Sequence, residues 1–266
     1  MKRPAPKKFL SQNFLINEWT IKKIINVCDL NDSDIVLEIG PGEGALTKHI
    51  APKVKYIYAV EKDYQLADEL KKNLKFDNLK IIQGDILKFS ISQLPQPIKI
   101  IGNLPYNIST PIIEKLIEHR NVINEAFIMV QKEFAQRLMA KTSTKSYGSL
   151  SCFVQYYFEP QLLFYIKNTH FFPAPKVESA YMRLTSLTTP PIKCSDEPRL
   201  FSLIQKSFSQ RRKTILNALS QDCPKENLLQ ILTKLKLNPQ LRPENLSLKH
   251  FISIAEEIFN SDHPSR

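Results

Sequence analysis

Short apolar runs alternate with amphipathic stretches along the first two thirds of the chain. The runs are rich in Ile and Val and are four or five residues long, which is typical of strands buried in a parallel sheet. They occupy residues 35–39, 56–60, 79–82, 98–101 and 126–130. Helices are expected to begin near residues 17, 45, 63, 109 and 132. This alternation predicts a doubly wound α/β domain.

The order of elements changes in the following stretch. Strands at 162–166 and 177–184 have no helix between them, so we expect an antiparallel hairpin that closes the sheet. Thr188-Thr189-Pro190-Pro191 has the composition of a linker. Beyond it, apolar positions at helical spacing predict a small all-helical domain. The predicted domains are therefore residues 1–187 and 188–266.

The helix that begins near Asn17 follows the run Gln12-Asn13-Phe14-Leu15, in which apolar and amide residues mix without a clear period. This helix is predicted to present a single apolar face. The residues expected on that face are Trp19, Ile21, Ile24, Ile25 and Cys28.

A glycine-rich loop, residues 40–44, directly follows the first predicted strand. Gly40 and Gly42 allow a tight turn and let a ligand approach the backbone closely, so both are candidate cofactor-binding positions. The spacing Gly-x-Gly-x-Gly differs from the Gly-x-Gly-x-x-Gly of dinucleotide enzymes. With Glu38 inside the strand, it fits the loop of S-adenosylmethionine enzymes better than a dinucleotide loop.

Acidic residues end the next two predicted strands. Glu61 lies about 20 positions beyond the glycine loop, where it is placed to accept hydrogen bonds from both ribose hydroxyls of an adenosine. Asp85 follows the third strand, where it could accept from the adenine amine of the cofactor. A single acidic strand end is more often a solvated cap. Two in succession after a glycine loop favour a ligand site.

The fourth strand opens into Asn103-Leu104-Pro105-Tyr106. These residues suit the binding of a planar base that bears an exocyclic amine. The Asn103 side-chain oxygen and the Leu104 carbonyl would accept from the amine, and Tyr106 would stack on the ring. The alternative is an ordinary turn at the end of a strand, because Asn and Pro are common turn residues.

A second aromatic candidate lies between the two strands of the predicted hairpin. Phe172 is followed by prolines at alternate positions, Pro173 and Pro175, which stiffen the loop. Phe172 would form the wall of the base pocket opposite Tyr106. An aromatic side chain that covers the edge of the sheet explains the spacing equally well.

The overall charge points to a polyanionic partner. Lys and Arg total 37 against 26 Asp and Glu, which gives a formal net charge of +11. Such an excess favours nucleic acid or an anionic membrane surface, although solubility alone is a further explanation. The candidate phosphate contacts are Lys7, Lys8, Arg211, Arg212 and Lys213. A solvated helix face explains the last three as often as phosphate binding does, but the Lys-rich N-terminus and the net charge of +11 favour phosphate contact.

Several classes of protein are excluded by composition. No apolar run approaches the roughly 20 residues that a membrane span needs, and the basic N-terminus lacks the apolar core of a secretory signal. The 4 cysteines are far apart, which predicts reduced thiols and a cytoplasmic protein. The 5 histidines also lack metal-ligand spacing, so no metal is predicted.

Taken together, these motifs identify a family. The matching pieces are Gln12–Leu15, Val36–Gly44, Glu61, Gly84-Asp85, Asn103–Tyr106, Phe172–Ser179, Arg211–Thr214 and Arg242–Ser247. Over nearly its whole length the chain resembles the ribosomal RNA adenine N6,N6-dimethyltransferases, and within them the bacterial group that acts on 16S RNA. One departure is Ser11, where the family usually has Gly before the Gln-Asn-Phe-Leu run.

The resemblance implies a Rossmann-like catalytic domain that binds S-adenosyl-L-methionine and a small helical domain that binds RNA. By the family's pattern, the cofactor site would be lined by Asn13, Leu15, Gly40, Glu61, Asp85 and Asn103. Tyr106 and Phe172 would lie at the target base. Two methyl groups would pass to each of two adjacent adenines in a loop near the 3′ end of 16S RNA. The partner would be the precursor of the 30S subunit, with a role in ribosome biogenesis.

Three alternatives remain at this point. The antibiotic-resistance relatives that dimethylate an adenine of 23S RNA share the glycine loop and the Asn-x-Pro-Tyr type of motif, but the segments 172–179 and 242–247 argue against them. A ribosome-assembly factor whose binding matters more than its catalysis is a second. A DNA adenine methyltransferase, with similar pocket chemistry, is a third. A monomer is expected, because each long apolar stripe has a core to face.

Overall fold

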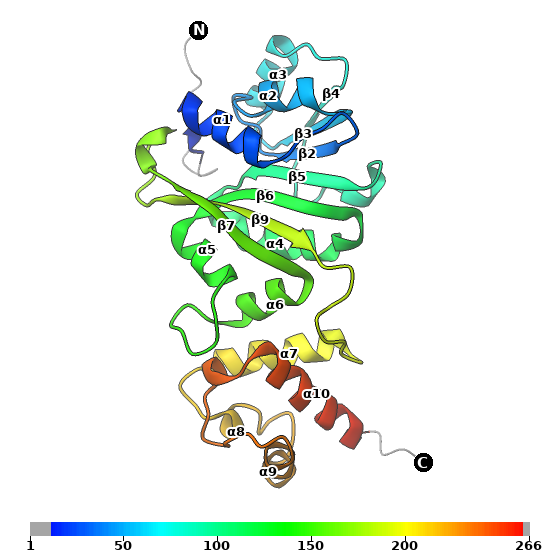
Figure 1. Ribbon diagram of the computed structural model, residues 1–266, viewed down its shortest axis with the longest axis vertical. Helices are drawn as coiled ribbons and strands as arrows, with labels where there is room; N and C mark the ends of the chain where they lie inside the picture. The colour runs from blue at the N-terminus through cyan, green and yellow to red at the C-terminus, as the bar shows by residue number, and fades with distance from the viewer. Residues whose placement is uncertain (1–11, 263–266) are drawn as a thin grey trace. The chain divides into compact units, whose positions relative to one another are not determined.

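The computed structural model describes residues 12–262 (Figure 1), which form two compact units. Of the described residues, the first unit contains those from residue 12 to Ala135 together with Phe158–Ser186. The second contains Gln136–Tyr157 and the described residues from Leu187 to residue 262. Within the described range, no helix combines the length and the apolar content needed to cross a membrane.

A seven-stranded sheet forms the centre of the first unit, counting the described residues, with the order β4-β3-β2-β5-β6-β9-β7. The strands are β2 (Ile35–Ile39), β3 (Tyr56–Glu61), β4 (Leu79–Gln83), β5 (Ile98–Asn103), β6 (Ile123–Gln131), β7 (Phe158–Ile166) and β9 (Ser179–Ser186). β2 to β6 are parallel, whereas β9 runs antiparallel to both β6 and β7. The predicted doubly wound sheet with an antiparallel closing hairpin is confirmed.

Helices cover both faces of this sheet, with α1 and α3 on one side and α4 on the other (Figure 1). The α-helices are α1 (Glu18–Val27), α2 (Thr47–Ile50), α3 (Tyr64–Asn73), α4 (Ser109–Glu118) and α5 (Lys132–Leu138). Single 3-10 turns are η2 (Ala51–Lys53), η3 (Ile91–Gln93), η4 (Tyr106–Ile108), η5 (Arg120–Val122) and η6 (Asn168–His170). The sequence did not predict a short antiparallel ribbon of β1 (Phe14–Leu15) and β8 (Phe171–Phe172).

Asn17 caps the start of helix α1, because its side chain accepts a hydrogen bond from the main-chain nitrogen of Thr20. Most of its predicted apolar face is buried, namely Ile21, Ile24, Ile25 and Cys28. The prediction for Trp19 was wrong, because this side chain is 67% exposed. A residue two positions before Ile21 lies about 200° away around the helix, which puts it opposite the buried stripe.

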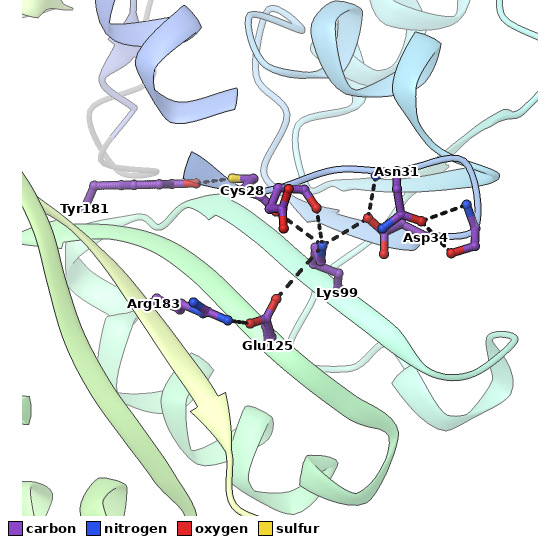
Figure 2. A network of polar contacts seen from close by, with 9 residues as sticks. Cys28, Asn31, Asp34, Lys99, Glu125, Tyr181 and Arg183 are labelled. Carbon is purple, nitrogen blue, oxygen red and sulfur yellow. Dashed lines mark hydrogen bonds and ion pairs between the residues drawn. The ribbon is translucent and has the colours of Figure 1, made fainter. Parts of the chain in front are cut away.

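A buried polar network joins the end of α1 to the start of β5 (Figure 2). This is the edge of the sheet where the parallel strands begin, opposite their carboxyl ends. The ammonium of Lys99, near the start of β5, donates to the main-chain oxygens of Cys28 at 3.2 Å and Asp29 at 3.0 Å. It also donates to a carboxylate oxygen of Asp34 at 3.0 Å. These contacts satisfy carbonyl groups at the end of α1 and hold the helix against the sheet.

The second unit is helical, as predicted. Its elements are α6 (Ser149–Tyr157), α7 (Glu197–Ser209), α8 (Ile215–Ala218), α9 (Lys225–Lys234), η7 (Pro243–Asn245) and α10 (Leu248–Asp262). The predicted division of the chain differs from the observed one for residues 136–157, which were assigned to the first domain. They belong to the second unit because α6 packs on α7. The Tyr157 hydroxyl donates to Glu197 at 2.6 Å, and the Tyr156 and Phe201 ring centroids are 5.3 Å apart.

Candidate active site

A cavity of about 240 Å³ lies in the first unit, where β2, β3 and β5 end. Parallel strands place their carboxyl ends at one edge of the sheet, and the residues that follow them meet there. The predicted site residues that line the cavity are Asn13, Gly40, Gly42, Glu61, Asp85, Asn103, Leu104 and Tyr106. The structure therefore brings most of the predicted site together, although the residues come from five separate segments of the chain.

The glycine loop has the backbone that its sequence suggested. Gly40 and Gly42 have φ values of 65° and 58°, in the left-handed region that side chains disfavour. A Cβ atom at Gly42 would lie 3.1 Å from the Cδ1 atom of Phe14, which also lines the cavity. Glycine at position 42 thus serves both the turn and the close approach of the N-terminal segment.

Glu61 holds this loop from the tip of β3. One carboxylate oxygen accepts from the main-chain nitrogen of Gly42 at 3.1 Å, and the other accepts from that of Asp63 at 2.8 Å. Burial raises the pKa of Glu61, and these backbone hydrogen bonds oppose the shift. A carboxylate has about four lone-pair sites, so the fixed side chain can still accept from hydroxyl groups in the cavity.

Asp85 is a carboxylate that a lysine keeps ionised. Its Oδ2 atom lies 2.7 Å from the ammonium of Lys62, and its Oδ1 atom accepts from the main-chain nitrogen of Leu87 at 3.0 Å. The contact with Lys62 is the main reason that the pKa of Asp85 is lowered. Lys62 also lines the cavity, and sequence reasoning missed it. Its position directly after Glu61 was the available signal.

Asn103 ends β5 with its amide in a defined orientation. The side-chain nitrogen donates to the main-chain oxygen of Asn13 at 2.8 Å. Because a carbonyl accepts this bond, the amide nitrogen must face Asn13, which leaves the side-chain oxygen as an acceptor for another group. Leu104 is buried, and its main-chain nitrogen donates to the oxygen of Met129 at 3.0 Å, which fixes the backbone that carries its own carbonyl.

The side chain of Tyr106 is held in place by a hydrogen bond of its hydroxyl group. Its hydroxyl lies 2.6 Å from that of the buried Ser179 on β9, and burial raises the pKa of the phenol. A ring fixed in this way presents its face at a constant position in the cavity wall.

Phe172 lies on the rim of this region rather than in its wall. Among the described residues, it is not one of those that line the cavity, and its side chain is 46% exposed. It pairs directly with Phe14 across the β1–β8 ribbon. Directly opposite residues project to the same face of a ribbon, so Phe172 stands beside a ring that does line the cavity. Its role at the target base stays a prediction.

Leu15 lines a smaller neighbouring cavity of about 30 Å³ and does not line the main one. The two cavities share Gly40, Gly42 and Asn103, so Leu15 is close to the predicted site. Glu38 also lines this smaller space. Its carboxylate accepts from the Thr47 hydroxyl at 2.7 Å, and burial raises its pKa to about 8.

The predicted RNA-contacting residues have different surroundings. Lys7 and Lys8 lie outside the described residues. In the second unit, Arg212 and Lys213 are exposed after the end of α7. Arg211 instead pairs with Glu244 and donates to the main-chain oxygen of Lys145 at 2.8 Å. Its guanidinium thus holds segments of the second unit together, and its role as a phosphate contact stays a prediction.

Carboxylates and imidazoles do not gather into a metal site in the part of the chain that the structure describes. No group of three or more His, Cys, Asp or Glu side chains within residues 12–262 has the arrangement to hold an ion.

Comparison with known proteins gives extensive matches. The family described as ribosomal RNA adenine dimethylase matches residues 5–260. A protein of Geobacillus sp. (strain WCH70) named ribosomal RNA small subunit methyltransferase A is 40% identical, over 95% of this chain and 91% of the relative. A protein of the same name from Hahella chejuensis (strain KCTC 2396) is 39% identical, over 98% of this chain and 94% of the relative.

Solved structures match as well. A dimethyladenosine transferase from Plasmodium falciparum is 29% identical with a TM-score of 0.79, over 91% of this chain and 95% of that protein. The 23S rRNA methyltransferase ErmE is 26% identical with a TM-score of 0.73, over 93% of this chain and 100% of that protein. Both share the fold of this chain over nearly its whole length.

Proposed function

Because this chain belongs to the ribosomal RNA adenine dimethylase family, we propose that it dimethylates the N6 amine of adenines in small-subunit ribosomal RNA. It is an S-adenosylmethionine-dependent methyltransferase with a Rossmann-like catalytic unit. The observation that carries the proposal is the amide of Asn103, which is oriented by the main chain of Asn13 at the edge of the cavity.

The residues of the cavity fit S-adenosylmethionine. The fixed carboxylate of Glu61 suits the two ribose hydroxyls, and the ionised Asp85 suits the adenine amine. Gly40 and Gly42 leave the backbone of the loop accessible to a ligand. When bound, S-adenosylmethionine supplies a methyl group on a sulfonium, which is an intrinsically good donor.

Asn103 and Leu104 make the target amine a better nucleophile. The amine of adenine is a poor nucleophile because its lone pair is delocalised into the ring. The side-chain oxygen of Asn103 and the carbonyl of Leu104 accept its two N–H groups and favour a geometry that frees the lone pair. The Asn103 side chain is fixed by its hydrogen bond to the main-chain oxygen of Asn13, and the Leu104 backbone is fixed by its hydrogen bond to the main-chain oxygen of Met129. Both acceptors are therefore preorganised for this task.

Tyr106 and Phe172 hold the base itself. Enzymes that act on a base in RNA or DNA commonly take it out of its stack and bind it between aromatic side chains. Tyr106 presents a ring whose tip is fixed by Ser179, and Phe172 stands on the rim beside Phe14. The contact between Phe172 and the base needs only that the base enter from the side of the β1–β8 ribbon.

No strong base takes part in the proposed reaction. Asn103 stays neutral, and both oxygens of Glu61 are held by backbone nitrogens. The proton of the amine leaves to water after transfer, so positioning supplies much of the acceleration. Transfer of a second methyl group requires the pocket to readmit an adenine that has one N–H left, which Asn103 or Leu104 accepts alone.

The relatives favour RNA of the small subunit over 23S RNA. Identity reaches 40% with a small-subunit methyltransferase and is 26% with the 23S methyltransferase ErmE. We further propose a more specific target, namely two adjacent adenines near the 3′ end of 16S RNA in a 30S precursor. The motifs at residues 172–179 and 242–247 support this target. We further propose that the protein acts as a monomer in the cytoplasm during ribosome biogenesis.

Methyl transfer from labelled S-adenosylmethionine tests this function. The acceptors are under-methylated 30S particles, naked 16S RNA, 50S particles and duplex DNA, and digestion with mass analysis locates the label. We expect N6,N6-dimethyladenine at two neighbouring positions of the 30S RNA, and a large loss of label with Asn103→Ala.

Each other result has a distinct meaning. Label in 23S RNA would assign the protein to the 23S type, and label in DNA would contradict an RNA substrate. Cofactor binding without transfer to any acceptor would identify an assembly factor built on a methyltransferase fold.

A further inference from the structure

Exposed apolar residues are concentrated in two segments of the first unit that are joined by hydrogen bonds. Of the seven exposed large hydrophobic residues in the described chain, five lie in the segments 16–19 and 165–177, namely Ile16, Trp19, Tyr165, Phe172 and Val177. The β1–β8 ribbon and a hydrogen bond from the Ile16 nitrogen to the His170 oxygen, 2.9 Å long, join these segments. Tyr165 projects to the opposite face of β7 from Phe164 and contacts Lys132, so we leave it out. We call the other four residues, Ile16, Trp19, Phe172 and Val177, the aromatic surface. Such clustering is unusual, because exposed apolar residues are normally scattered.

Trp19 is the most exposed member of the aromatic surface, at 67%, and is the only tryptophan of the chain. Lys23, one turn further along α1, places its ammonium 5.1 Å from the centre of the Trp19 ring and 4.1 Å from that of Phe164. These cation–π contacts limit the positions of the indole. The ring is therefore pre-oriented on the surface and still open to a further partner.

The charge around this surface suits a polyanion. The segments 14–23 and 164–178 contain the lysines Lys22, Lys23, Lys167 and Lys176. Their two acidic residues are already neutralised by lysines from elsewhere, Glu18 by Lys48 at 3.3 Å and Glu178 by Lys132 at 2.7 Å. The four lysines therefore give these two segments a net positive charge, next to the exposed ring of Trp19.

We propose that Trp19 stacks on an unpaired base of the substrate RNA, outside the cavity that receives the target adenine. This inference rests on the proposed function. Aromatic rings interleaved with lysines bind single-stranded RNA by stacking on bases while the ammonium groups contact phosphates. The ribbon that carries Phe14 into the cavity wall also carries Phe172 on the aromatic surface. A strand whose target base enters the cavity therefore meets this surface with its neighbouring nucleotides.

Because Trp19 is the only tryptophan, its emission reports directly on the proposed contact. The full chain is titrated at fixed salt with an RNA hairpin whose loop holds two adjacent adenines, and with a fully paired RNA duplex of equal length. We expect the hairpin to quench the emission and to protect the indole from acrylamide, and the duplex to have little effect.

Variants supply the energetic test. Trp19→Ala is expected to weaken hairpin binding about 5- to 150-fold, the range that corresponds to loss of one base–aromatic stack. Trp19→Phe should restore most of the affinity, since it keeps a stacking face. In methyl transfer, Trp19→Ala should raise KM for RNA and leave kcat and cofactor affinity unchanged. Tyr64→Ala, a matched control that removes an aromatic side chain 69% exposed on α3, should change none of these values.

The outcomes separate this inference from the proposed function. If the wild type methylates 30S RNA but hairpin binding is the same in Trp19→Ala, and the hairpin does not quench the emission, the stacking role is overturned while the function stands. If a ribosomal protein quenches Trp19 and RNA does not, the surface is a protein interface and the inference fails. Quenching by the hairpin and loss of affinity in Trp19→Ala, without methyl transfer by the wild type, would support the stacking and refute the function.

Discussion

The side-chain nitrogen of Asn103 donates a hydrogen bond of 2.8 Å to the main-chain oxygen of Asn13. This contact joins the end of β5 to the segment that precedes β1, two regions 90 residues apart in sequence. It also decides the chemistry, because the amide oxygen is left as the acceptor that the target amine requires. An aspartate at this position could not make the same contact, since its carboxylate has no N–H to donate.

Asn103→Ala should therefore reduce turnover far more than cofactor affinity. Loss of one preorganised polar group that acts mainly in the transition state typically costs about 10²- to 10³-fold in kcat. Single-turnover methylation of 30S particles measures the first quantity, and calorimetric titration with S-adenosylmethionine measures the second. Equal losses in both would show that Asn103 serves cofactor binding instead.

Glu61→Gln should, in contrast, reduce cofactor affinity far more than turnover. The amide of Gln would direct its NH2 group at the main-chain nitrogen of Gly42 or Asp63, so one of two backbone hydrogen bonds is lost. We expect cofactor affinity to fall about 5- to 150-fold, with kcat at saturating cofactor much less affected. Glu69→Gln, which changes an exposed carboxylate on α3, is the matched control and should leave both values unaltered.

Glu38 should make the stability of the protein depend on pH. Burial raises its pKa from 4.5 to about 8, so the folded state holds a proton that the unfolded state releases above pH 4.5. The free energy of unfolding should consequently decrease as the pH rises from 4.5 to about 8, by an amount on the order of a few kcal/mol.

Urea unfolding of wild type and Glu38→Gln across this range checks the prediction. The variant should show a flatter dependence, because its side chain does not titrate. Glu114→Gln, an exposed position on α4, should retain the slope of the wild type. Identical slopes in wild type and Glu38→Gln would exclude Glu38 as the source.

Arg211, Arg212 and Lys213 should separate into structural and RNA-binding roles. Arg212→Ala and Lys213→Ala remove exposed charges, so each should weaken RNA binding and reduce the salt-dependence slope by about one. Arg211→Ala removes the pair with Glu244, so it should lower the thermal stability of the second unit. Filter binding at several salt concentrations and thermal melts distinguish these effects. A loss of stability in Arg212→Ala as large as in Arg211→Ala would contradict the assignment.

The sequence predicted those parts of the molecule that depend on local pattern. Buried strands are short apolar runs, and parallel strands bring their ends together, so the meeting of Gly40, Glu61, Asp85 and Asn103 could be predicted. The β1–β8 ribbon could not, because strands of two residues are too short to show a period.

Other features depend on contacts between distant parts of the chain. The membership of residues 136–157 in the second unit follows from the contact of Tyr157 with Glu197, which spans 40 residues. The ion pair between Arg211 and Glu244 likewise could not be predicted from the residues around position 211. Side-chain pairing of this kind is decided by tertiary structure and not by local propensity.

Lys99 should matter for stability and not for chemistry. Its ammonium is nearly buried and lies 3.0 Å from the Asp34 carboxylate and 3.9 Å from that of Glu125, which also pairs with Arg183 (Figure 2). Lys99→Met would leave the partly buried Asp34 without this cation and would remove the donor to the end of α1. Breaking a buried ion pair by removing one partner typically costs about 3–5 kcal/mol.

Chemical unfolding of Lys99→Met should show a loss of that order, while kcat per folded molecule is retained, since Asn103 lies at the other end of β5. Lys72→Met provides the matched control. Lys72 pairs with Asp68 on the surface of α3 and is 71% exposed, so solvent screens the pair and its removal should leave the free energy of unfolding nearly unchanged. If the two variants were equally stable, the network around Lys99 would not be what holds α1 to the sheet.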